Sequence, residues 1–451
     1  MMNKTVALIS LGCAKNLVNS EQMMWLLSNA GFETAIVPDA VDAAGFDIAV
    51  VNTCGFIDTA KAEAIDVLLE LGEMKAEGQV GKLICAGCLP ERYKGEIAAE
   101  LPEIDAFVGV GGFGDIVSAA IGERTAIFPP PESFDDNTER MVSTPGAWAY
   151  LKIADGCDNR CAFCAIPDIR GHFRSRPEEE ILAEAKKLAA QGVREIIIIA
   201  QDITRYGVDL YGQQRLASLV RKISEIEGFD WIRLHYLYPD LFTDELINEI
   251  AENSKILKYL DIPIQHINNG ILKRMNRRGT GENIRKLLQT LRERIPGVVL
   301  RTSLITGLPG EGDAEFEELM EFLQAAKIER VGVFPYSPEE GTPAAAMERP
   351  DAETAKRRAE LVEMLQSRIM DDFNDSRIGT GAKVLLEGKE NGRLYGRSFA
   401  ESPDIDGVVF FDSTAENVKN VIIGEIYSVI ITGSDGGDVV GKLIGAFYEP
   451  S

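Results

Sequence analysis

Three closely spaced cysteines constrain this chain more than any other feature of its sequence. Cys157, Cys161 and Cys164 are separated by three and then two residues, so one short loop can direct three thiolates at a single centre. An ordinary cubane iron–sulfur cluster takes four cysteine thiolates, and a loop with three leaves one iron free to bind something other than protein. The spacing therefore predicts a 4Fe-4S cluster with one open iron.

Two other interpretations of this loop, a zinc site and buried thiols without a metal, fit the residues less well. A structural zinc site closes with four ligands and often recruits histidine, whereas only His172 lies nearby in the sequence. Three buried thiols without a metal would need an apolar surrounding segment. The spacer Asp158, Asn159 and Arg160 is too polar for that.

The loop, with Phe163 directly before its last cysteine, resembles the signature of the radical S-adenosylmethionine (SAM) enzymes. In that family the open iron chelates the amino and carboxylate groups of SAM. An electron from the cluster then splits SAM into methionine and a 5'-deoxyadenosyl radical that abstracts hydrogen. Residues 165–171 and 174–177 resemble those of the methylthiotransferases, which insert sulfur into a carbon–hydrogen bond and carry a methyl group on that sulfur.

Residues 1–140 are predicted to form a first domain, an α/β doubly wound parallel sheet, because short apolar runs alternate with helical patterns. A polar, proline-rich stretch at 129–137 marks its end. The expected strands are Val6 to Leu11, Ile48 to Asn52, Lys82 to Cys85 and Ala106 to Val110, and the expected helices are Glu21 to Asn29 and Ala60 to Leu71.

Cys13, Cys54 and Cys88 each follow one of these strands and each has a glycine beside it. Since ligands of such sheets bind beyond the carboxyl ends of the strands, the three loops should converge on one edge and hold a second cluster. Each cysteine taken singly would more often be a buried core thiol. The same motifs resemble the N-terminal domain of methylthiotransferases, in which three cysteines hold an auxiliary 4Fe-4S cluster that carries the sulfur to be inserted.

Cys85 is the exception among the cysteines of this domain. It lies inside an apolar strand pattern, so it is assigned to the core. A redox pair of Cys85 with Cys88 is the alternative.

Residues 141–376 are predicted to form a second domain of repeated βα units, hence a parallel sheet with right-handed crossovers. The radical SAM resemblance implies a partial (β/α) barrel. A helix is expected from Pro177 to Gln191, ended by Gly192, and a charged helix from about 350 to 375. The expected strands are 149–154, 193–200, 231–236, 259–263, 298–305 and 331–335.

Four side chains at the carboxyl ends of these strands are candidates for binding SAM, because functional groups of such barrels lie there. They are Gln201, Asp202, Arg301 and Ser303. By resemblance, Asp202 occupies the position of an acid that contacts the amino group of SAM. His235 and His266 are interpreted as hydrogen-bonded structural residues. No side chain is assigned as catalytic, since removing hydrogen from an unactivated carbon requires the cofactors.

Two basic segments each allow two interpretations. Arg170, Arg174 and Arg176 could form a solvated turn paired with the many surrounding acids, or could hold SAM or a substrate carboxylate through bidentate contacts. The run 273–278 is typical of a solvated helix end, although it could also face an RNA or an acidic protein segment.

Residues 377–451 are predicted to form a third domain, a small antiparallel β-barrel. The expected strands are 382–387, 393–398, 408–411, 426–431 and 439–448. Position and pattern resemble the TRAM domain that ends methylthiotransferases. Residues 396–407 resemble the ribosomal-protein-modifying branch, whose members methylthiolate the β-carbon of an aspartate in small-subunit ribosomal protein 12, with a second SAM as the methyl donor.

The net charge of the chain indicates which class of macromolecule it binds. The net charge is -24, and residues 381–451 carry 6 Lys plus Arg against 11 Asp plus Glu. Nucleic acid is therefore not expected as the main partner, because phosphate binding relies on cations. The predicted partner is the basic ribosomal protein, bound through the acidic barrel, together with a reductant protein such as a flavodoxin. The alternatives are a tRNA adenosine methylthiotransferase and a non-enzymatic iron–sulfur carrier.

The composition also predicts a location. No apolar run approaches the roughly 18 residues of a membrane span, and the N-terminal apolar run is too short for a signal peptide. The seven cysteines cluster in motifs rather than in a disulfide framework. A cytoplasmic enzyme without membrane contact is expected.

Overall fold

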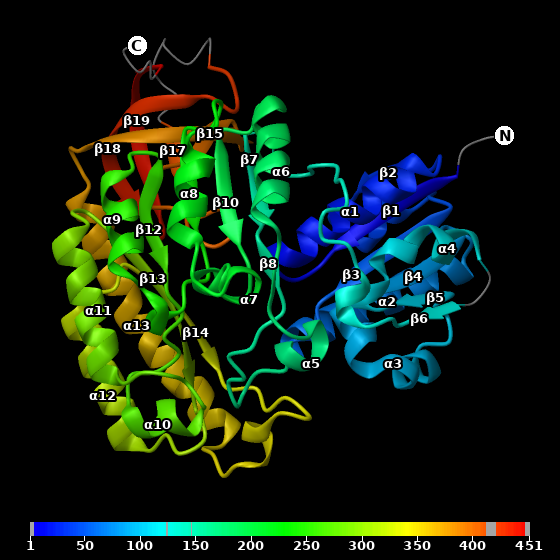
Figure 1. Cartoon of the computed structure of the whole chain (residues 1–451), viewed down its shortest axis with the longest axis horizontal. Helices are drawn as coiled ribbons and strands as arrows, with labels where there is room; N and C mark the ends of the chain where they lie inside the picture. The colour runs from blue at the N-terminus through cyan, green and yellow to red at the C-terminus, as the bar shows by residue number, and fades with distance from the viewer. Residues whose placement is uncertain (1–3, 123–124, 146, 412–420, 447–451) are drawn as a thin grey trace.

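Three successive units, each built on its own sheet, form the chain in the order that the sequence predicts (Figure 1). The computed structural model describes residues 4–122, 125–145, 147–411 and 421–446. None of the described helices has the length and apolar character to cross a membrane.

The first sheet has six parallel strands in the order β2-β1-β3-β4-β5-β6. Its strands are β1 (Thr5–Ser10), β2 (Glu33–Ile36), β3 (Ile48–Thr53), β4 (Lys82–Gly87), β5 (Ala106–Val108) and β6 (Thr125–Ile127). Four of them are the predicted strands. The sequence missed β2 and β6, because both are short edge strands that are only partly buried and so show no continuous apolar run.

Helices cover both faces of this sheet, as a doubly wound layout requires. They are α1 (Ala14–Asn29), α2 (Asp58–Ala76), α3 (Cys88–Glu100) and α4 (Ile116–Ile121). Val50 packs under α1 and α4, while its neighbour Val51 packs under α2 and α3. This alternation follows from the period of two in a strand, and each face has its own apolar core.

Helix α1 begins seven residues earlier than the predicted start at Glu21, immediately after Cys13. The added turns carry Asn16, Asn19 and Ser20, which are buried although they are polar. A pattern of apolar residues cannot reveal such turns, because their burial depends on hydrogen-bond partners from other parts of the chain.

The middle unit is a six-stranded parallel sheet in the order β14-β13-β12-β11-β10-β7. Its strands are β7 (Trp148–Lys152), β10 (Glu195–Ile199), β11 (Trp231–Leu234), β12 (Ile256–Asp261), β13 (Val299–Thr306) and β14 (Arg330–Pro335). Helices α6 (Glu178–Ala190), α8 (Leu216–Ser224), α9 (Asp244–Glu252), α11 (Gly281–Arg294), α12 (Asp313–Ala326) and α13 (Ala352–Ser376) share one core with its outer face. The sheet ends at β7 and β14 without closing, so the predicted partial barrel is confirmed.

The open edge of this sheet is covered by the first unit. Val18 of α1 packs on Tyr150, Ile197 and Ile199, which face the inside of the partial barrel. Because α1 starts at Cys13, the edge of the first sheet that carries three cysteines is held against the inside of the second sheet.

The last unit is a closed barrel in the order β15-β16-β17-β19-β18. Its strands are β15 (Gly381–Glu390), β16 (Arg393–Arg397), β17 (Val409–Phe411), β18 (Ile426–Asp435) and β19 (Asp438–Ala446). All five were predicted, and residues 447–448 of the last prediction lie outside the described residues. The pairing of β17 with β19 is parallel, whereas the other neighbours are antiparallel. The chain reaches β19 from β17 through β18, and a crossover of this kind permits parallel pairing.

The connection between β16 and β17, residues 398–408, docks this barrel on the amino ends of the middle strands. Arg397 pairs with buried Glu195 at 2.7 Å, and the Tyr259 hydroxyl donates to Asp406 at 2.6 Å. The middle strands run away from the last barrel (Figure 1). Their carboxyl ends, where functional groups were expected, are therefore left to the first unit.

Candidate functional site

The loop of Cys157, Cys161 and Cys164 lies beyond the carboxyl end of β7, after the two-residue strand β8 (Ala154–Asp155). Gly156 makes the entry to the loop possible. Its φ is +77°, and a Cβ there would lie 2.0 Å from the carbonyl oxygen of His172. A side chain at this position is excluded both by strain and by lack of space.

The three thiols of this loop lie within electrostatic range of one another. Burial, and then the neighbouring thiol of Cys161, raises the pKa of Cys164. Burial raises the pKa of Cys157 to about 11. The guanidinium of Arg277 lies 3.6 Å from the sulfur of Cys161. Metal ligation requires thiolates, so binding at this loop must release protons, and a nearby cation favours that release.

The second set, Cys13, Cys54 and Cys88, follows the adjacent strands β1, β3 and β4. A Cβ on Gly12 would lie 2.8 Å from the Cβ of Cys54, and one on Gly55 would lie 2.8 Å from the carbonyl oxygen of Cys88. The predicted convergence of the three loops is confirmed. They meet next to the point where the strand order reverses, between β1 and β3, which is where such sheets bind ligands.

The electrostatic surroundings of these three thiols differ. Burial alone would raise the pKa of Cys13, but the cations Lys15 and Arg170 outweigh it, and the pKa of Cys13 is lowered. Burial, followed by the charges of Cys88 and Cys13, raises the pKa of Cys54 to about 12. Cys13 precedes α1 and Cys88 opens α3, so the positive ends of two helices also face this set.

Cys85 is fully buried within β4 and packs in the core under α2 and α3. Burial raises its pKa to about 12. Its assignment to the core is confirmed.

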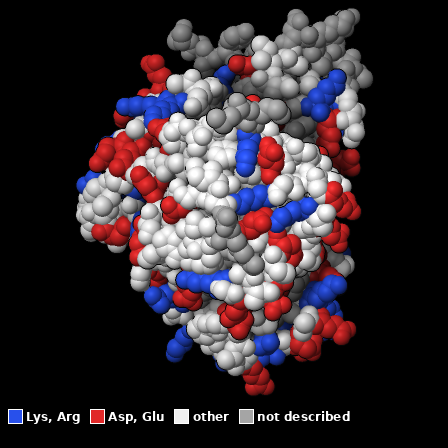
Figure 2. All heavy atoms as spheres, turned by 90° about the vertical axis from the view of Figure 1, so that its right-hand side faces the viewer, with Lys and Arg blue, Asp and Glu red and all other residues white. Residues whose placement is uncertain are grey.

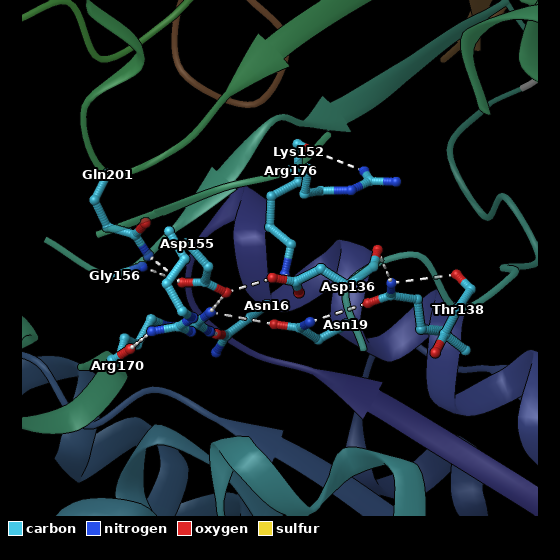
Figure 3. A network of polar contacts seen from close by, with 12 residues as sticks. Asn16, Asn19, Asp136, Thr138, Lys152, Asp155, Gly156, Arg170, Arg176 and Gln201 are labelled. Carbon is cyan, nitrogen blue, oxygen red and sulfur yellow. Dashed lines mark hydrogen bonds and ion pairs between the residues drawn. The ribbon is translucent and has the colours of Figure 1, made fainter. Parts of the chain in front are cut away.

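A buried polar network joins the two cysteine sets (Figure 3). Arg170, at the end of the short helix α5 (Ile166–Arg170), donates to Asp155 at 2.8 Å and to Asn16 at 2.6 Å. The Asn16 oxygen also lies 3.8 Å from the sulfur of Cys88. Asp155 lies two residues before Cys157, so the guanidinium of Arg170 connects the two cysteine sets. The Arg170 side chain is 1% exposed.

The four candidates for SAM contacts fall into two pairs. Gln201 donates to Asp155 at 2.8 Å, and Asp202 accepts from Asn159 of the cysteine loop at 2.9 Å. Burial raises the pKa of Asp202. Arg301 instead pairs with Asp261 at 2.7 Å inside the partial barrel, and Ser303 follows it on β13. The first pair thus lies against the cysteine loop, while no described contact joins the second pair to it.

Arg170 and Arg176 pair with acids as the first interpretation expected, but neither is solvated, so that part of the interpretation is wrong for both. Arg170 is paired with Asp155, and Arg176 with Glu184 at 2.6 Å. Both guanidiniums are buried. Arg170 has the buried carboxylate of Asp155 as its partner and Arg176 the half-buried carboxylate of Glu184, so each guanidinium is paired with an acid inside the fold.

Two residues of the other basic run were missed as site residues. Arg277 contacts Cys161, and Arg278 pairs with Asp240 and donates to Asn159 of the cysteine loop. The run follows helix α10 (Asn269–Arg274), so a solvated helix end was the natural expectation. The only signal in the sequence was the crowding of four cations into six residues.

Both His235 and His266 have hydrogen-bonding partners, as expected. His235 lies 3.0 Å from the hydroxyl of Ser402, and His266 accepts from the backbone N–H of Asn268 at 3.0 Å. Their roles are consistent with structural residues.

The donor sets suit iron–sulfur clusters. Each offers three thiols on converging loops, and thiolates are the usual ligands of such clusters. No three His, Cys, Asp or Glu side chains among the described residues are grouped to hold a metal ion, so the assignment of the two sets rests on three thiols on converging loops and not on a preformed metal site. Buried polar atoms without a hydrogen-bond partner lie near the cysteine loop: the Gln201 carbonyl oxygen and the hydroxyls of Tyr238 and Tyr336. Unpaired buried polar groups of this kind are typical of a ligand site.

Models of three protein families match the chain. The radical SAM superfamily matches residues 151–323, a family described as uncharacterized protein family UPF0004 matches residues 5–109, and the TRAM domain matches residues 378–444. The three matches follow the three sheets.

Curated relatives match over nearly the whole length. A protein of Acetivibrio thermocellus is 47% identical over 98% of this chain and 99% of the relative. One of Geobacter sulfurreducens is 47% identical over 97% of this chain and 98% of the relative. One of Clostridium botulinum is 45% identical over 97% of both. All three are named ribosomal protein uS12 methylthiotransferase RimO.

Solved structures share the fold at low identity. The radical SAM methyltransferase TsrM of Kitasatospora setae has a TM-score of 0.57 at 16% identity, covering 76% of this chain and 77% of that one. The cobalamin-dependent SAM radical enzyme OxsB has a TM-score of 0.51 at 13% identity, covering 81% of this chain and 56% of that one.

Proposed function

The chain belongs to the family of the RimO ribosomal protein uS12 methylthiotransferases, and on this premise we propose that it adds a methylthio group to the β-carbon of an aspartate in uS12. The observation that carries the proposal is the pair of three-cysteine sets joined by the buried Arg170–Asp155 pair. Sulfur insertion needs a radical source and a sulfur source close together, and the two sets provide one place for each.

The cofactors are SAM and an iron–sulfur cluster; Cys157, Cys161 and Cys164 would hold the cluster, which with SAM would supply the radical chemistry of hydrogen abstraction. Asn159 and Asp202 hold the loop in place by their hydrogen bond. Gln201 and Asp202 face the SAM site, and we extend this site to Arg301 and Ser303 on the inner surface of β13.

A second 4Fe-4S cluster is proposed at Cys13, Cys54 and Cys88. The convergence of the three loops supports this assignment, and two cations lie near Cys13 and favour its thiolate, which is the form that binds metal. The cations Lys15 and Arg170 supply this effect. A second SAM molecule is proposed as the methyl donor.

The proposed domains are residues 1–140, 141–376 and 377–451. Each contains one large sheet with a core of its own, and the boundaries fall between the matched family models. In this division the first domain holds the sulfur source, the second the radical source, and the third is the proposed contact with uS12.

The charge of the chain supports a basic protein as substrate. The net charge is -24. On the face turned toward the viewer in Figure 2, which belongs largely to the first domain, the described acidic and basic side chains are interspersed without a continuous basic band. An acidic chain attracts a basic ribosomal protein and repels nucleic acid. A flavodoxin-like reductant in the cytoplasm completes the proposal.

The experiment is mass spectrometry of uS12 and of tRNA from a strain that lacks this chain. We expect the methylthio group to disappear from uS12 and to remain on tRNA. The reverse result would identify a tRNA enzyme.

Experiments on purified protein distinguish the roles of the two cysteine sets. Anaerobically reconstituted wild type should contain about 8 iron atoms per chain and form 5'-deoxyadenosine with SAM and dithionite. Replacing Cys13, Cys54 and Cys88 by Ala should leave 5'-deoxyadenosine but no methylthiolated uS12. Replacing Cys157, Cys161 and Cys164 should abolish both. A wild type that forms no 5'-deoxyadenosine would instead be an iron–sulfur carrier.

A further inference from the structure

Lys15 is a buried cation for which no described carboxylate serves as an ion-pair partner. It is the second residue of α1, two positions after Cys13, and it is 7% exposed. Its ammonium lies 3.5 Å from the centre of the Tyr236 ring. Buried lysines are rare unless paired, because desolvation of the charge is costly. Lys15 therefore calls for a physical explanation.

The position of Lys15 lies between the two halves of the site. Tyr236 follows β11 at the carboxyl end of the middle sheet, whereas α1 belongs to the first sheet. The backbone of Tyr236 has a φ of +64°. Such a value is uncommon for a residue other than glycine and marks a strained position. Tyr236 packs with Leu17, Tyr150 and Ile199. The ammonium is thus held at the inner side of the partial barrel, beside the Cys13 set.

Other cations near the two cysteine sets already have partners. Arg170 and Lys152 share Asp155, and Arg301 pairs with Asp261. Arg277 donates to Cys161 and to the carbonyl of Pro263. Arg174 donates to the backbone carbonyls of residues 170 and 172. Lys15 contacts the Tyr236 side chain and acts electrostatically on the Cys13 thiol, but no carboxylate among the described residues pairs with it, and an ammonium has three donors to offer.

The proposed reaction places a carboxylate in this region. The target β-carbon of the aspartate is bonded directly to the carboxylate carbon, so the carboxylate must enter with the carbon that reacts. A carboxylate taken out of water without a cation is strongly disfavoured. Because the β-carbon must come near both cysteine sets, the required cation must lie between them.

We propose that the Lys15 ammonium binds the carboxylate of the substrate aspartate and so orients its β-carbon between the two cysteine sets. This inference rests on the proposed function. The Tyr236 ring keeps the ammonium in place before the substrate arrives, through a cation–π contact. A charge-assisted hydrogen bond replaces solvent around the carboxylate when the substrate binds.

The test compares two forms of uS12, the natural protein and one in which the target aspartate is replaced by asparagine. Binding of each to the anaerobically reconstituted full chain is measured by fluorescence anisotropy. We expect wild type to bind the asparagine form about 10- to 100-fold more weakly, as the loss of one hydrogen bond between charged groups predicts. Lys15→Met should bind both forms equally, and Lys15→Arg should keep part of the preference.

The matched control is Lys186→Met, the same change at an exposed lysine of α6 on the outer face. It should keep the full preference for aspartate. The inference is overturned if wild type binds both forms of uS12 equally, a result that needs no variant of the enzyme, or if Lys15→Met keeps the wild-type ratio. A chain that never methylthiolates uS12 would refute the proposed function. A chain that methylthiolates uS12 but binds the natural and the asparagine forms equally would refute only the role of Lys15.

Discussion

His235 shows how burial changes a single residue. It is 1% exposed and lies among Arg233, Arg301 and Lys15. Burial, and then these cations, lowers its pKa well below the ordinary 6.5. The folded protein therefore keeps the ring neutral, while the unfolded chain takes up a proton below pH 6.5. Because the unfolded state binds more protons, the free energy of unfolding falls as the pH falls through this range.

His235→Asn should remove this pH dependence. Between pH 7.5 and 5.5, we expect wild type to lose about 1.4 kcal/mol more of its free energy of unfolding than the variant, which is the value of one proton over one pH unit. Denaturant titrations at the two pH values measure the difference. His172→Asn, at a ring whose side chain is 77% exposed, is the control and should behave like wild type. Equal losses in His235→Asn and wild type would contradict the lowered pKa.

At the scale of elements, the contact between strands β16 and β10 shows how the last barrel is joined to the middle sheet. Glu195, at the start of β10, is fully buried and accepts from both Arg233 and Arg397. Burial by itself raises the pKa of Glu195, but the two guanidiniums outweigh it, and its pKa is lowered. The carboxylate thus stays charged, and Arg397 on β16 fixes the last barrel to the middle sheet.

Arg397→Met should destabilise the protein by roughly 3–5 kcal/mol, because it leaves buried carboxylates with too few cations. The loss is measured by denaturant unfolding at neutral pH. Lys389→Met, at an exposed position on the neighbouring strand β15, is the matched control and should change stability by less than about 0.5 kcal/mol. A similar small loss for Arg397→Met would mean that apolar packing alone docks the barrel.

At the scale of the whole molecule, two of the polar contacts that hold the first unit on the second lie beside the cysteine sets. One is the Arg170 network. The other is formed by Glu339, from the loop after β14, which pairs with Lys61 at 2.8 Å and Arg92 at 2.7 Å. Arg92 also donates to the carbonyl of Gly55, next to Cys54. Both contacts therefore reach the loops of the second cysteine set, and the relative position of the two sets depends on them.

Glu339→Gln should loosen this second contact by roughly 3 kcal/mol, since two cations would face a neutral amide. Hydrogen exchange followed by mass spectrometry should show faster exchange in the first turns of α2 and α3. Glu340→Gln changes the adjacent, exposed carboxylate and serves as the control. Unchanged exchange in Glu339→Gln would show that the other contacts between the two units, the Arg170 network among them, are sufficient.

Much of the fold follows from local patterns. Runs such as Ile196 to Ile199 identify buried strands, and the five short segments after residue 380 identify the last barrel. The two cysteine sets were also visible, because loop spacing and the positions after strands are local properties of the sequence. The short strands β2 and β6 and the first turns of α1 were missed, since their burial is only partial or involves polar side chains.

The sequence by itself determined most of the buried strands and where six cysteines stand, because both depend on neighbours in the chain. Only the tertiary structure decided which charged groups meet. Arg170 and Asn16 are 154 residues apart, and Arg397 and Glu195 are 202 residues apart. Whether a cation is solvated, paired or left free for a substrate depends on which distant carboxylate the fold brings to it. For that reason Arg170 proved to be structural, and Lys15 was left without a carboxylate partner among the described residues.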